Sequence, residues 1–283
     1  MDEKVRGNLL IIGGAEDKKS DCIILRRFVE LAGGKNAIIA IITTAAEQPR
    51  KVGNQYRALL YDLGAQRVEV LFISEREDAG DPRIIEQIQQ CTGVFFTGGD
   101  QLRITSIIGG SAVDDAIRKA YEHGVVIAGT SAGASVMSDT MIVEGDSTDT
   151  AKKCTLNMAH GMGLLKEVVV DQHFAQRGRI NRLLTAVAQN PHVLGVGLDE
   201  DTAIVVNAEG IFEVIGSQTV TVVDGRFIRY TNVSESEPNE PLALSNVILH
   251  ILPTGYYFNL DLRQPFSAAE KQTAERKSAV EQS

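Results

Sequence analysis

The chain is organised around Val125-Val126-Ile127-Ala128-Gly129-Thr130-Ser131-Ala132-Gly133-Ala134-Ser135, where an apolar strand-like run leads into Gly-x-Ser-x-Gly and then into small, helix-compatible residues. This context is typical of a nucleophile elbow, a sharp strand-to-helix turn that exposes one serine hydroxyl above a sheet. Glycines suit such a turn because its backbone angles are crowded or positive. The helix N-terminus behind the serine can stabilise developing negative charge. Glycine and serine also gather in ordinary tight turns, so the interpretation depends on partners elsewhere in the chain.

Short aliphatic runs alternate with segments of helical periodicity in the first half of the chain. The expected strands are Leu9 to Ile12, Ala37 to Ile42, Val68 to Ile73 and Gly93 to Thr97, and the expected helices are Asp21 to Leu31, Asn54 to Leu63, Arg83 to Gln90 and Ala112 to His123. This alternation predicts βαβ units and a doubly wound, mostly parallel sheet of the α/β class. Loops at the carboxyl ends of such strands build the active site. Gly13-Gly14, Gly98-Gly99 and Ser131 all follow predicted strands.

After residue 140 the pattern changes. Val168 begins a strand that runs into polar residues, and Arg179 to Gln189 is expected to be helical. Later runs of β-type residues predict antiparallel hairpins, because Glu209-Gly210 and Asp224-Gly225 are turn signals between them. These runs are Ala203 to Asn207, Ile211 to Ile215, Thr219 to Val223 and Val247 to Leu252. We find no boundary linker and expect a single α/β domain over residues 1–265. Residues 266–283 lack an apolar face and are expected to form a disordered tail.

The bulk properties narrow the class of protein. A net charge of −9 and a pI near 5.1 argue against nucleic-acid or anionic-membrane partners, which would require a basic face. The N-terminus has no signal-peptide pattern, and no run approaches the roughly 18 apolar residues of a spanning helix. Three widely spaced cysteines, Cys22, Cys91 and Cys154, indicate free thiols in a reducing compartment. We therefore expect a cytoplasmic protein without a membrane or nucleic-acid partner.

A serine nucleophile requires a base within hydrogen-bond reach and a carboxylate that orients this base. The chain has five histidines. Four of them have a simpler structural interpretation: His123 lies at a predicted helix end, His192 in a turn, His160 in a loop and His250 inside a late strand. His173 instead follows a predicted buried strand and is flanked by polar and charged side chains. It is therefore the candidate base, with a core or surface histidine as the alternative.

The candidate acid comes from Asp199-Glu200-Asp201, where three carboxylates follow another aliphatic stretch. A paired carboxylate there would suit an imidazolium, and a solvated acidic turn is the alternative. An α/β-hydrolase places its acid before its histidine. Here only His250 follows a plausible acid, and it lies inside a predicted strand. The sequence therefore disfavours an α/β-hydrolase.

Two backbone amides are candidates for an oxyanion hole. The N–H of Ala132 belongs to the elbow, and that of Gly99 lies in the exit loop of the preceding strand. Glycine pairs are more often simple turns, which is the alternative for Gly99. Arg177, Arg179 and Arg182 follow His173 in sequence. They form either a solvated basic face or carboxylate clamps, and clamps would point to an acidic substrate.

Together, four spaced motifs resemble the cyanophycinase family, serine peptidases related to the aspartyl dipeptidase called peptidase E. The motifs are Gly98-Gly99-Asp100-Gln101-Leu102-Arg103, Gly129-Thr130-Ser131-Ala132-Gly133-Ala134, Val169-Val170-Asp171-Gln172-His173-Phe174 and Gly197-Leu198-Asp199-Glu200-Asp201-Thr202. The resemblance extends from Ile11 to about Phe258, and four motifs in the right order are far more specific than one. It implies a homodimer with the flavodoxin-like fold of class I glutamine-amidotransferase-like proteins.

The resemblance also implies a reaction, the hydrolysis of cyanophycin to β-Asp-Arg dipeptides. Cyanophycin is a poly-aspartate that carries arginine on each β-carboxyl. By this resemblance Ser131 is the nucleophile, His173 the general base and Glu200 its orienting acid. The positions that match substrate recognition are Gln101, Asp171, Gln172, Arg177, Arg179 and Arg182. The arginines can bind substrate carboxylates, and either Asp171 or Asp100 can pair with a substrate guanidinium. No metal and no organic cofactor are implied.

Three other interpretations are weighed against this one. A peptidase E-like aspartyl dipeptidase would use the same chemistry, and only a polymer-degradation test separates the two. A non-catalytic binding protein with this fold would be expected to lack Ser131, His173 or Glu200. A glutamine amidotransferase would require a cysteine at position 131, where this chain has serine.

Overall fold

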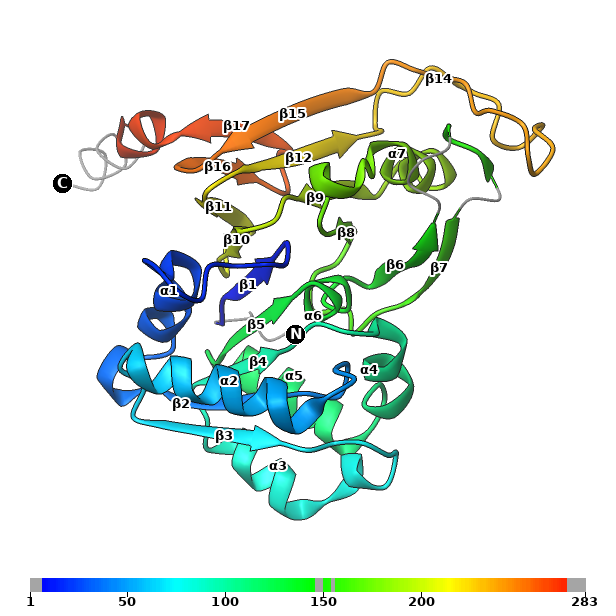
Figure 1. Cartoon of the computed structure of the whole chain (residues 1–283). Helices are drawn as coiled ribbons and strands as arrows, with labels where there is room; N and C mark the ends of the chain where they lie inside the picture. The colour runs from blue at the N-terminus through cyan, green and yellow to red at the C-terminus, as the bar shows by residue number, and fades with distance from the viewer. Residues whose placement is uncertain (1–6, 146–149, 154–155, 274–283) are drawn as a thin grey trace.

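The computed structural model of the protein describes residues 7–145, 150–153 and 156–273 (Figure 1). Its centre is a nine-stranded sheet in the order β17-β16-β11-β10-β1-β5-β4-β2-β3. From β1 to β3 the neighbouring strands are parallel, and from β1 to β17 they are antiparallel. The bounds of these strands are β1 Leu9–Ile12, β2 Ile38–Ile42, β3 Arg67–Leu71, β4 Gly93–Phe96, β5 Val126–Thr130, β10 Thr202–Val206, β11 Ile211–Gly216, β16 Tyr256–Asn259 and β17 Gln264–Ser267.

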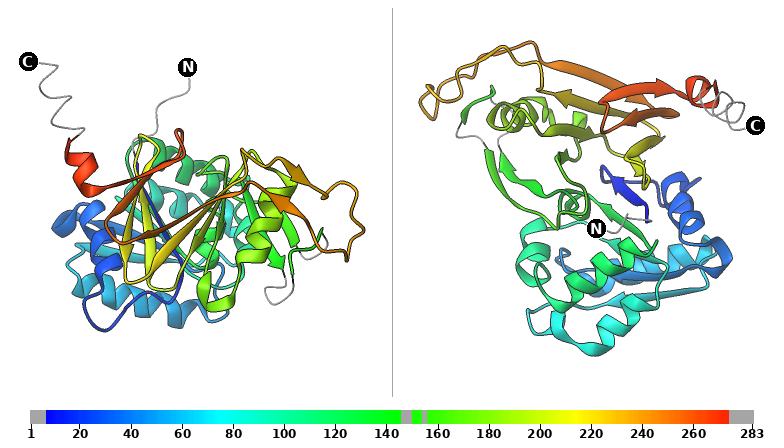
Figure 2. Two further views of the ribbon diagram at one scale, coloured as in Figure 1. Left: turned by 90° about the horizontal axis from the view of Figure 1, so that it is seen from above. Right: turned by 180° about the vertical axis from the view of Figure 1, so that it is seen from behind.

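A second sheet of four strands has the order β15-β12-β9-β8, with β8 and β9 parallel. Its strands are β8 Val168–Asp171, β9 Leu194–Leu198, β12 Thr219–Asp224 and β15 Ile248–Pro253. Two short ribbons complete the β-structure, and they are β6 Thr140–Gly145 with β7 Leu156–His160, and β13 Tyr230–Thr231 with β14 Leu244–Ser245. Figures 1 and 2 place the β6–β7 ribbon at one end of the molecule and β17 at the other.

Helices cover both faces of the parallel strands. Two of them, α1 and α2, share one buried cluster with these strands, and α3 and α5 share the cluster on the opposite face with the four-stranded sheet. Another helix, α7, packs on the outer side of the four-stranded sheet. The helices are α1 Ile23–Leu31, α2 Pro49–Asp62, α3 Pro82–Gln89, α4 Gln101–Ile107, α5 Ala112–Glu122, α6 Ala132–Ser135 and α7 Ile180–Gln189, with 3-10 turns η1 Gly34–Asn36, η2 Asp78–Gly80 and η4 Ala175–Arg177.

This burial explains why the first half of the chain is readable from sequence. Every residue of β1 is buried, so the strand is a continuous aliphatic run rather than an alternating one. The predicted doubly wound α/β sheet and its late antiparallel strands are confirmed. The largest boundary difference is in α2, which begins at Pro49 rather than Asn54. Proline is favoured at this position because its fixed φ suits the first helical turn.

In the second half of the chain, strands β13, β14 and β16 were not predicted, and the structure departs from the expectations in three further places. Asp224-Gly225 does not close a tight hairpin, because β12 pairs with β15 after a long excursion. The β6–β7 ribbon has an irregular register between Ile142 and Glu144 and was not predicted. The third departure is the expected start of the tail at residue 266, which is wrong because β17 adds to the open edge of β16.

Aromatic packing supports that last strand. Phe266 stacks on Tyr257 with their ring centroids 5.5 Å apart, and residues 268–273 are helical. The remainder of the expected tail, residues 274–283, lies outside the described residues, as does Cys154. Cys22 and Cys91 are buried free thiols. Within the described ranges, no helix has both the length and the apolar character required to cross a membrane.

Candidate active site

The predicted elbow forms between β5 and α6. Ser131 occupies the turn with φ 54° and ψ −110°, a conformation that non-glycine residues rarely adopt. Gly129 and Gly133 are required by close packing: a Cβ on Gly129 would overlap the carbonyl oxygen of Gly133, and one on Gly133 would overlap that of Phe96. Backbone strain of this kind is typical of functional turns because the surrounding structure must hold it in place.

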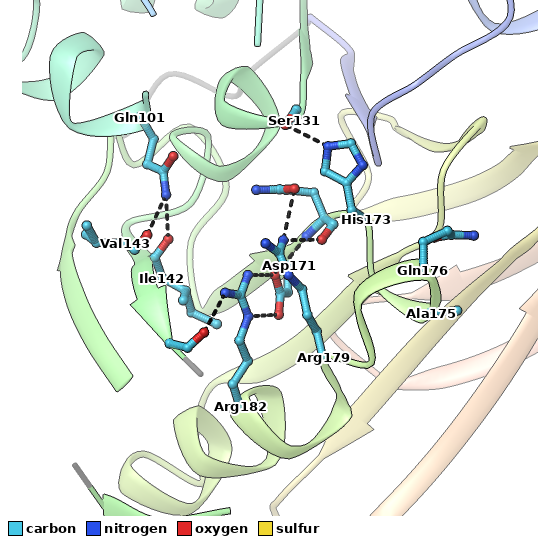
Figure 3. Close-up of polar contacts among 12 residues, drawn as sticks. Gln101, Ser131, Ile142, Val143, Asp171, His173, Ala175, Gln176, Arg179 and Arg182 are labelled. Carbon is cyan, nitrogen blue, oxygen red and sulfur yellow. Dashed lines mark hydrogen bonds and ion pairs between the residues drawn. The ribbon is translucent and has the colours of Figure 1, made fainter. Parts of the chain in front are cut away.

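Ser131 lies at one end of a hydrogen-bonded series of three side chains. The Ser131 Oγ is 3.0 Å from Nε2 of His173, and His173 Nδ1 is 2.7 Å from Oε1 of Glu200. Figure 3 shows the serine hydroxyl directed at the imidazole ring. With the proton on Nδ1, the ring donates to Glu200 and presents its Nε2 lone pair to the serine. This is the arrangement required for a serine nucleophile, its base and an orienting acid.

The exit loop of β1 positions the imidazole. The backbone N–H of His173 donates to the carbonyl oxygen of Gly13 at 2.8 Å, and His173 itself has a positive φ of 48°. A Cβ on Gly14 would lie 2.5 Å from Nε2 of the ring. Glycine at position 14 therefore provides the space that the imidazole occupies. The sequence showed a Gly-Gly pair at a strand exit but gave no sign of which residue it would contact.

Burial lowers the pKa of His173 below its ordinary value of 6.5. The hydrogen bond that His173 Nδ1–H donates to Glu200 opposes this lowering of the pKa, and the positive charge of Arg177 adds to it. Since the net direction is downward, the imidazole is neutral at pH 7 and can accept a proton from Ser131.

The three carboxylates that follow β9 have different partners. Asp199 is buried, accepts the N–H of Ala175 and binds the hydroxyl of Thr219. Asp201 accepts the N–H of Asp17 at 2.8 Å. Glu200 reaches His173, and the side chain of Gln176 accepts its backbone N–H at 3.0 Å. The first and third acids thus organise loops, whereas the second faces the imidazole.

The two candidate oxyanion donors lie on adjoining turns. A Cβ on Gly98 would be 3.3 Å from Cβ of Ser131, which places the exit loop of β4 directly beside the elbow. Gly99 has a positive φ of 140°. Among the described residues, neither the N–H of Gly99 nor that of Ala132 has a hydrogen-bond partner. Both amides are therefore available to a developing oxyanion.

A buried cluster of opposite charges lies behind the histidine. Asp171, Arg179 and Arg182 are all buried. Arg182 binds the Asp171 carboxylate in a two-pronged arrangement, with Nε 2.7 Å from Oδ2 and the second contact from Nη2 to Oδ1. Arg179 Nη1 lies 3.4 Å from the same carboxylate and binds both oxygens of Gln172 (Figure 3). Asp171 and Arg182 therefore neutralise each other's charge in the protein without substrate, and a direct contact of either side chain with the substrate stays a prediction.

Burial lowers the pKa of Arg179 to about 10, with Asp171 opposing the shift. The guanidinium is still charged at pH 7. Its Nε is buried and has no hydrogen-bond partner among the described residues. Arg179 is thus only partly neutralised by Asp171, and it remains a candidate for binding a substrate anion.

The other predicted recognition residues are arranged differently. Arg177 is exposed near His173, so its guanidinium is open to solvent. Gln101 donates from Nε2 to the backbone carbonyls of Ile142 and Val143, at 3.1 and 2.9 Å, and thereby holds β6 against α4. Asp100 is exposed and caps α4 by accepting the N–H of Leu102 at 2.8 Å.

One residue of the site was not given a role from sequence. Glu16 is almost fully buried, and its carboxylate accepts hydrogen bonds from the hydroxyls of Thr130 and Tyr56 and pairs with Lys18. Burial alone would raise the pKa of Glu16, but Lys18 and the two hydroxyls outweigh it and lower the pKa below its ordinary value. Because Thr130 precedes Ser131, this carboxylate connects the elbow to α2. A single acidic residue in a loop gave no signal of this bridge.

Comparison with known proteins shows the family to which the chain belongs. The family model described as peptidase family S51 matches residues 9–214. A protein named cyanophycinase from Geminocystis herdmanii is 42% identical over 94% of this chain and 98% of its own length. One of the same name from Trichormus variabilis is 42% identical over 93% of this chain and 89% of its own.

A solved structure gives the same picture of the fold. A peptidase from an acI-B1 Actinobacterium superposes with a TM-score of 0.65 at 20% sequence identity, covering 88% of this chain and 98% of that one. Because the family model matches residues 9–214, which include the serine elbow, and the named relatives match 94% and 93% of the chain, the chain belongs to peptidase family S51 and is a hydrolase.

Proposed function

We propose that the protein is a serine-type exopeptidase that hydrolyses cyanophycin to β-Asp-Arg dipeptides through an acyl-enzyme. The observation that carries the proposal is the hydrogen-bonded series from Ser131 through His173 to Glu200. The substrate is supported by the relatives named cyanophycinase, which match almost the whole chain.

The reaction begins with transfer of the Ser131 proton to Nε2 of His173. The serine oxygen attacks the carbonyl carbon of an aspartyl peptide bond, and the resulting oxyanion accepts hydrogen bonds from the N–H groups of Gly99 and Ala132. Glu200 stabilises the imidazolium that forms. His173 then donates its proton to the leaving amine as the peptide bond breaks. A water molecule attacks the acyl-enzyme by the same route and regenerates Ser131.

Substrate binding is divided among the predicted residues by their surroundings. Arg177 and Arg179 bind substrate carboxylates, and the exposed Asp100 binds a substrate cation. Gln172 orients Arg179, while Asp171 and Arg182 brace the loop that carries His173. Gln101 acts by holding β6. The substrate contacts thus come from the exit loops of β4 and β8.

A single hydrolytic domain is proposed for residues 1–265, extended to include β17. Its support is that β1 and β17, from opposite ends of the chain, belong to one sheet. A cytoplasmic homodimer is proposed from the resemblance to the family. The acidic composition supports the further proposal that the protein has no nucleic-acid partner and no membrane partner.

The test is incubation of the purified protein with insoluble cyanophycin, with mass spectrometry of the soluble products. We expect release of β-Asp-Arg, and none from Ser131→Ala. Cleavage of short aspartyl dipeptides without polymer release would instead assign a peptidase E-like activity. Retained polymer cleavage by Ser131→Ala would show that the nucleophile is misassigned.

A further inference from the structure

A second cluster of charged side chains lies beside Ser131 and has no role in the mechanism above. It lines a pocket of about 400 Å³ formed by Glu47, Gln48, Lys51, Gln55, Gly98 and Gly99. The last two residues connect it to the reaction centre, since a Cβ on Gly98 would lie 3.8 Å from Oγ of Ser131. A group in this pocket is therefore adjacent to the bond being cleaved.

The pocket wall is tied to the nucleophile by two separate connections. The carbonyl oxygen of Ala45 accepts the N–H of Asp100 at 3.0 Å and packs so closely on Gly99 that a Cβ there would overlap it. On the helix that carries Lys51 and Gln55, the hydroxyl of Tyr56 binds Glu16, the buried carboxylate that also holds Thr130. The distance from the pocket to Ser131 is thus fixed by the fold.

The polar side chains of the lining are one carboxylate, one ammonium group and two amides, and Ala46 and Val52 complete the wall. Glu47 and Lys51 are exposed, and within the described ranges neither forms an ion pair. Lys51 lies in the first turn of α2, where the helix N-terminus also favours a carboxylate. A pocket with both charges unpaired suits a ligand that is itself zwitterionic, whereas a simple anion or cation would meet repulsion from one of the two.

We propose that this pocket binds the β-linked arginine of the aspartyl residue next to the scissile bond. Glu47 pairs with its guanidinium and Lys51 with its free carboxylate, and Gln48 and Gln55 supply further hydrogen bonds. The inference rests on the proposed function, because it takes the branched substrate from there. It makes Glu47 and Lys51 specificity-determining residues of the hydrolysis.

Three synthetic aspartyl oligomers test the two charges separately. Their β-linked branches are arginine, citrulline, which is neutral at the guanidinium position, and agmatine, which lacks the carboxylate. We expect Glu47→Gln to lower kcat/KM for the arginine oligomer about tenfold and to leave the citrulline oligomer within about twofold. Lys51→Met should show the same loss with arginine and none with agmatine. The matched controls, Glu77→Gln and Lys35→Met, change exposed charges outside this pocket and should behave like the wild type.

Binding to a Ser131→Ala background by calorimetry provides the same comparison for any oligomer that is cleaved too slowly. Equal losses on all three oligomers, or no loss on the arginine oligomer, would overturn the pocket assignment. Failure of the wild type to cleave the arginine oligomer would instead overturn the proposed function. The two failures are therefore distinguishable.

Discussion

Replacing Asp171 with asparagine removes the negative charge that lies between the buried guanidinium groups of Arg179 and Arg182. Asp171 is 1% exposed, and Arg182 binds both of its oxygens. Asparagine keeps one acceptor oxygen but turns an amide toward Arg182, so one charge-assisted hydrogen bond, worth about 1.5–3 kcal/mol, is lost. The guanidinium is also left in a buried site without its counter-ion, which brings the expected loss of unfolding free energy to about 3–5 kcal/mol.

Urea denaturation followed by far-UV circular dichroism measures this loss, with kcat/KM for cyanophycin measured alongside. Asp100→Asn is the matched control: Asp100 is exposed, and asparagine caps a helix about as well as aspartate, so its stability should change by less than about 0.5 kcal/mol. The double variant Asp171→Leu with Arg182→Met should recover part of the lost stability, because it removes both members of the buried pair.

A different result would assign Asp171 to the substrate. If Asp171→Asn loses less than about 1 kcal/mol of stability while kcat/KM falls steeply, the carboxylate faces a substrate guanidinium and the bracing role is wrong.

Three further predictions concern Ser131, His173 and Glu200. Ser131→Gly and Ser131→Ala should both be inactive. Because glycine adopts the positive φ at this position without strain, the unfolding free energy of Ser131→Gly should exceed that of Ser131→Ala by about 1 kcal/mol in the same denaturation assay. Equal stabilities of the two variants would mean that the elbow is unstrained. The acid limb of the kcat/KM profile reports the pKa of the free base, so with His173 shifted downward, activity should rise with pH through a midpoint below 6.5. Since Glu200 raises the pKa of His173, Glu200→Gln should move the midpoint to a still lower pH and reduce kcat about a hundredfold or more. A midpoint that does not move would show that another group titrates.

The sequence was informative where local chemistry decides the structure. The parallel strands are buried on both faces and appear as aliphatic runs, and the elbow requires glycines that can be recognised by their spacing. His173 could be singled out because its polar neighbours follow an apolar strand. These signals are short-range, and they singled out His173 and Ser131, whose side chains lie 3.0 Å apart in the structure.

What could not be predicted depends on packing between distant segments. The antiparallel strands were expected, but nothing local specified that β10 would pair with β1 or that β17 would extend the same sheet. The pairing of Asp171 with Arg182 was hidden because a buried ion pair and an open binding site use the same residue types. Likewise, only the folded loops distinguish Glu200 from Asp199 and Asp201.

The exit loop of β1 also sets the order in which this enzyme can gain activity during synthesis. The carbonyl oxygen of Gly13 accepts a hydrogen bond from the N–H of His173, and that of Gly14 accepts one from the N–H of Asp201. Two residues that are synthesised early therefore bind segments that are synthesised much later. Contacts of such sequence separation form slowly. A nascent chain that ends before β10 can carry Ser131 but has no oriented base. The hydrogen-bonded series of Ser131, His173 and Glu200 therefore stays incomplete on the ribosome until the segments that carry His173 and Glu200 have emerged and docked.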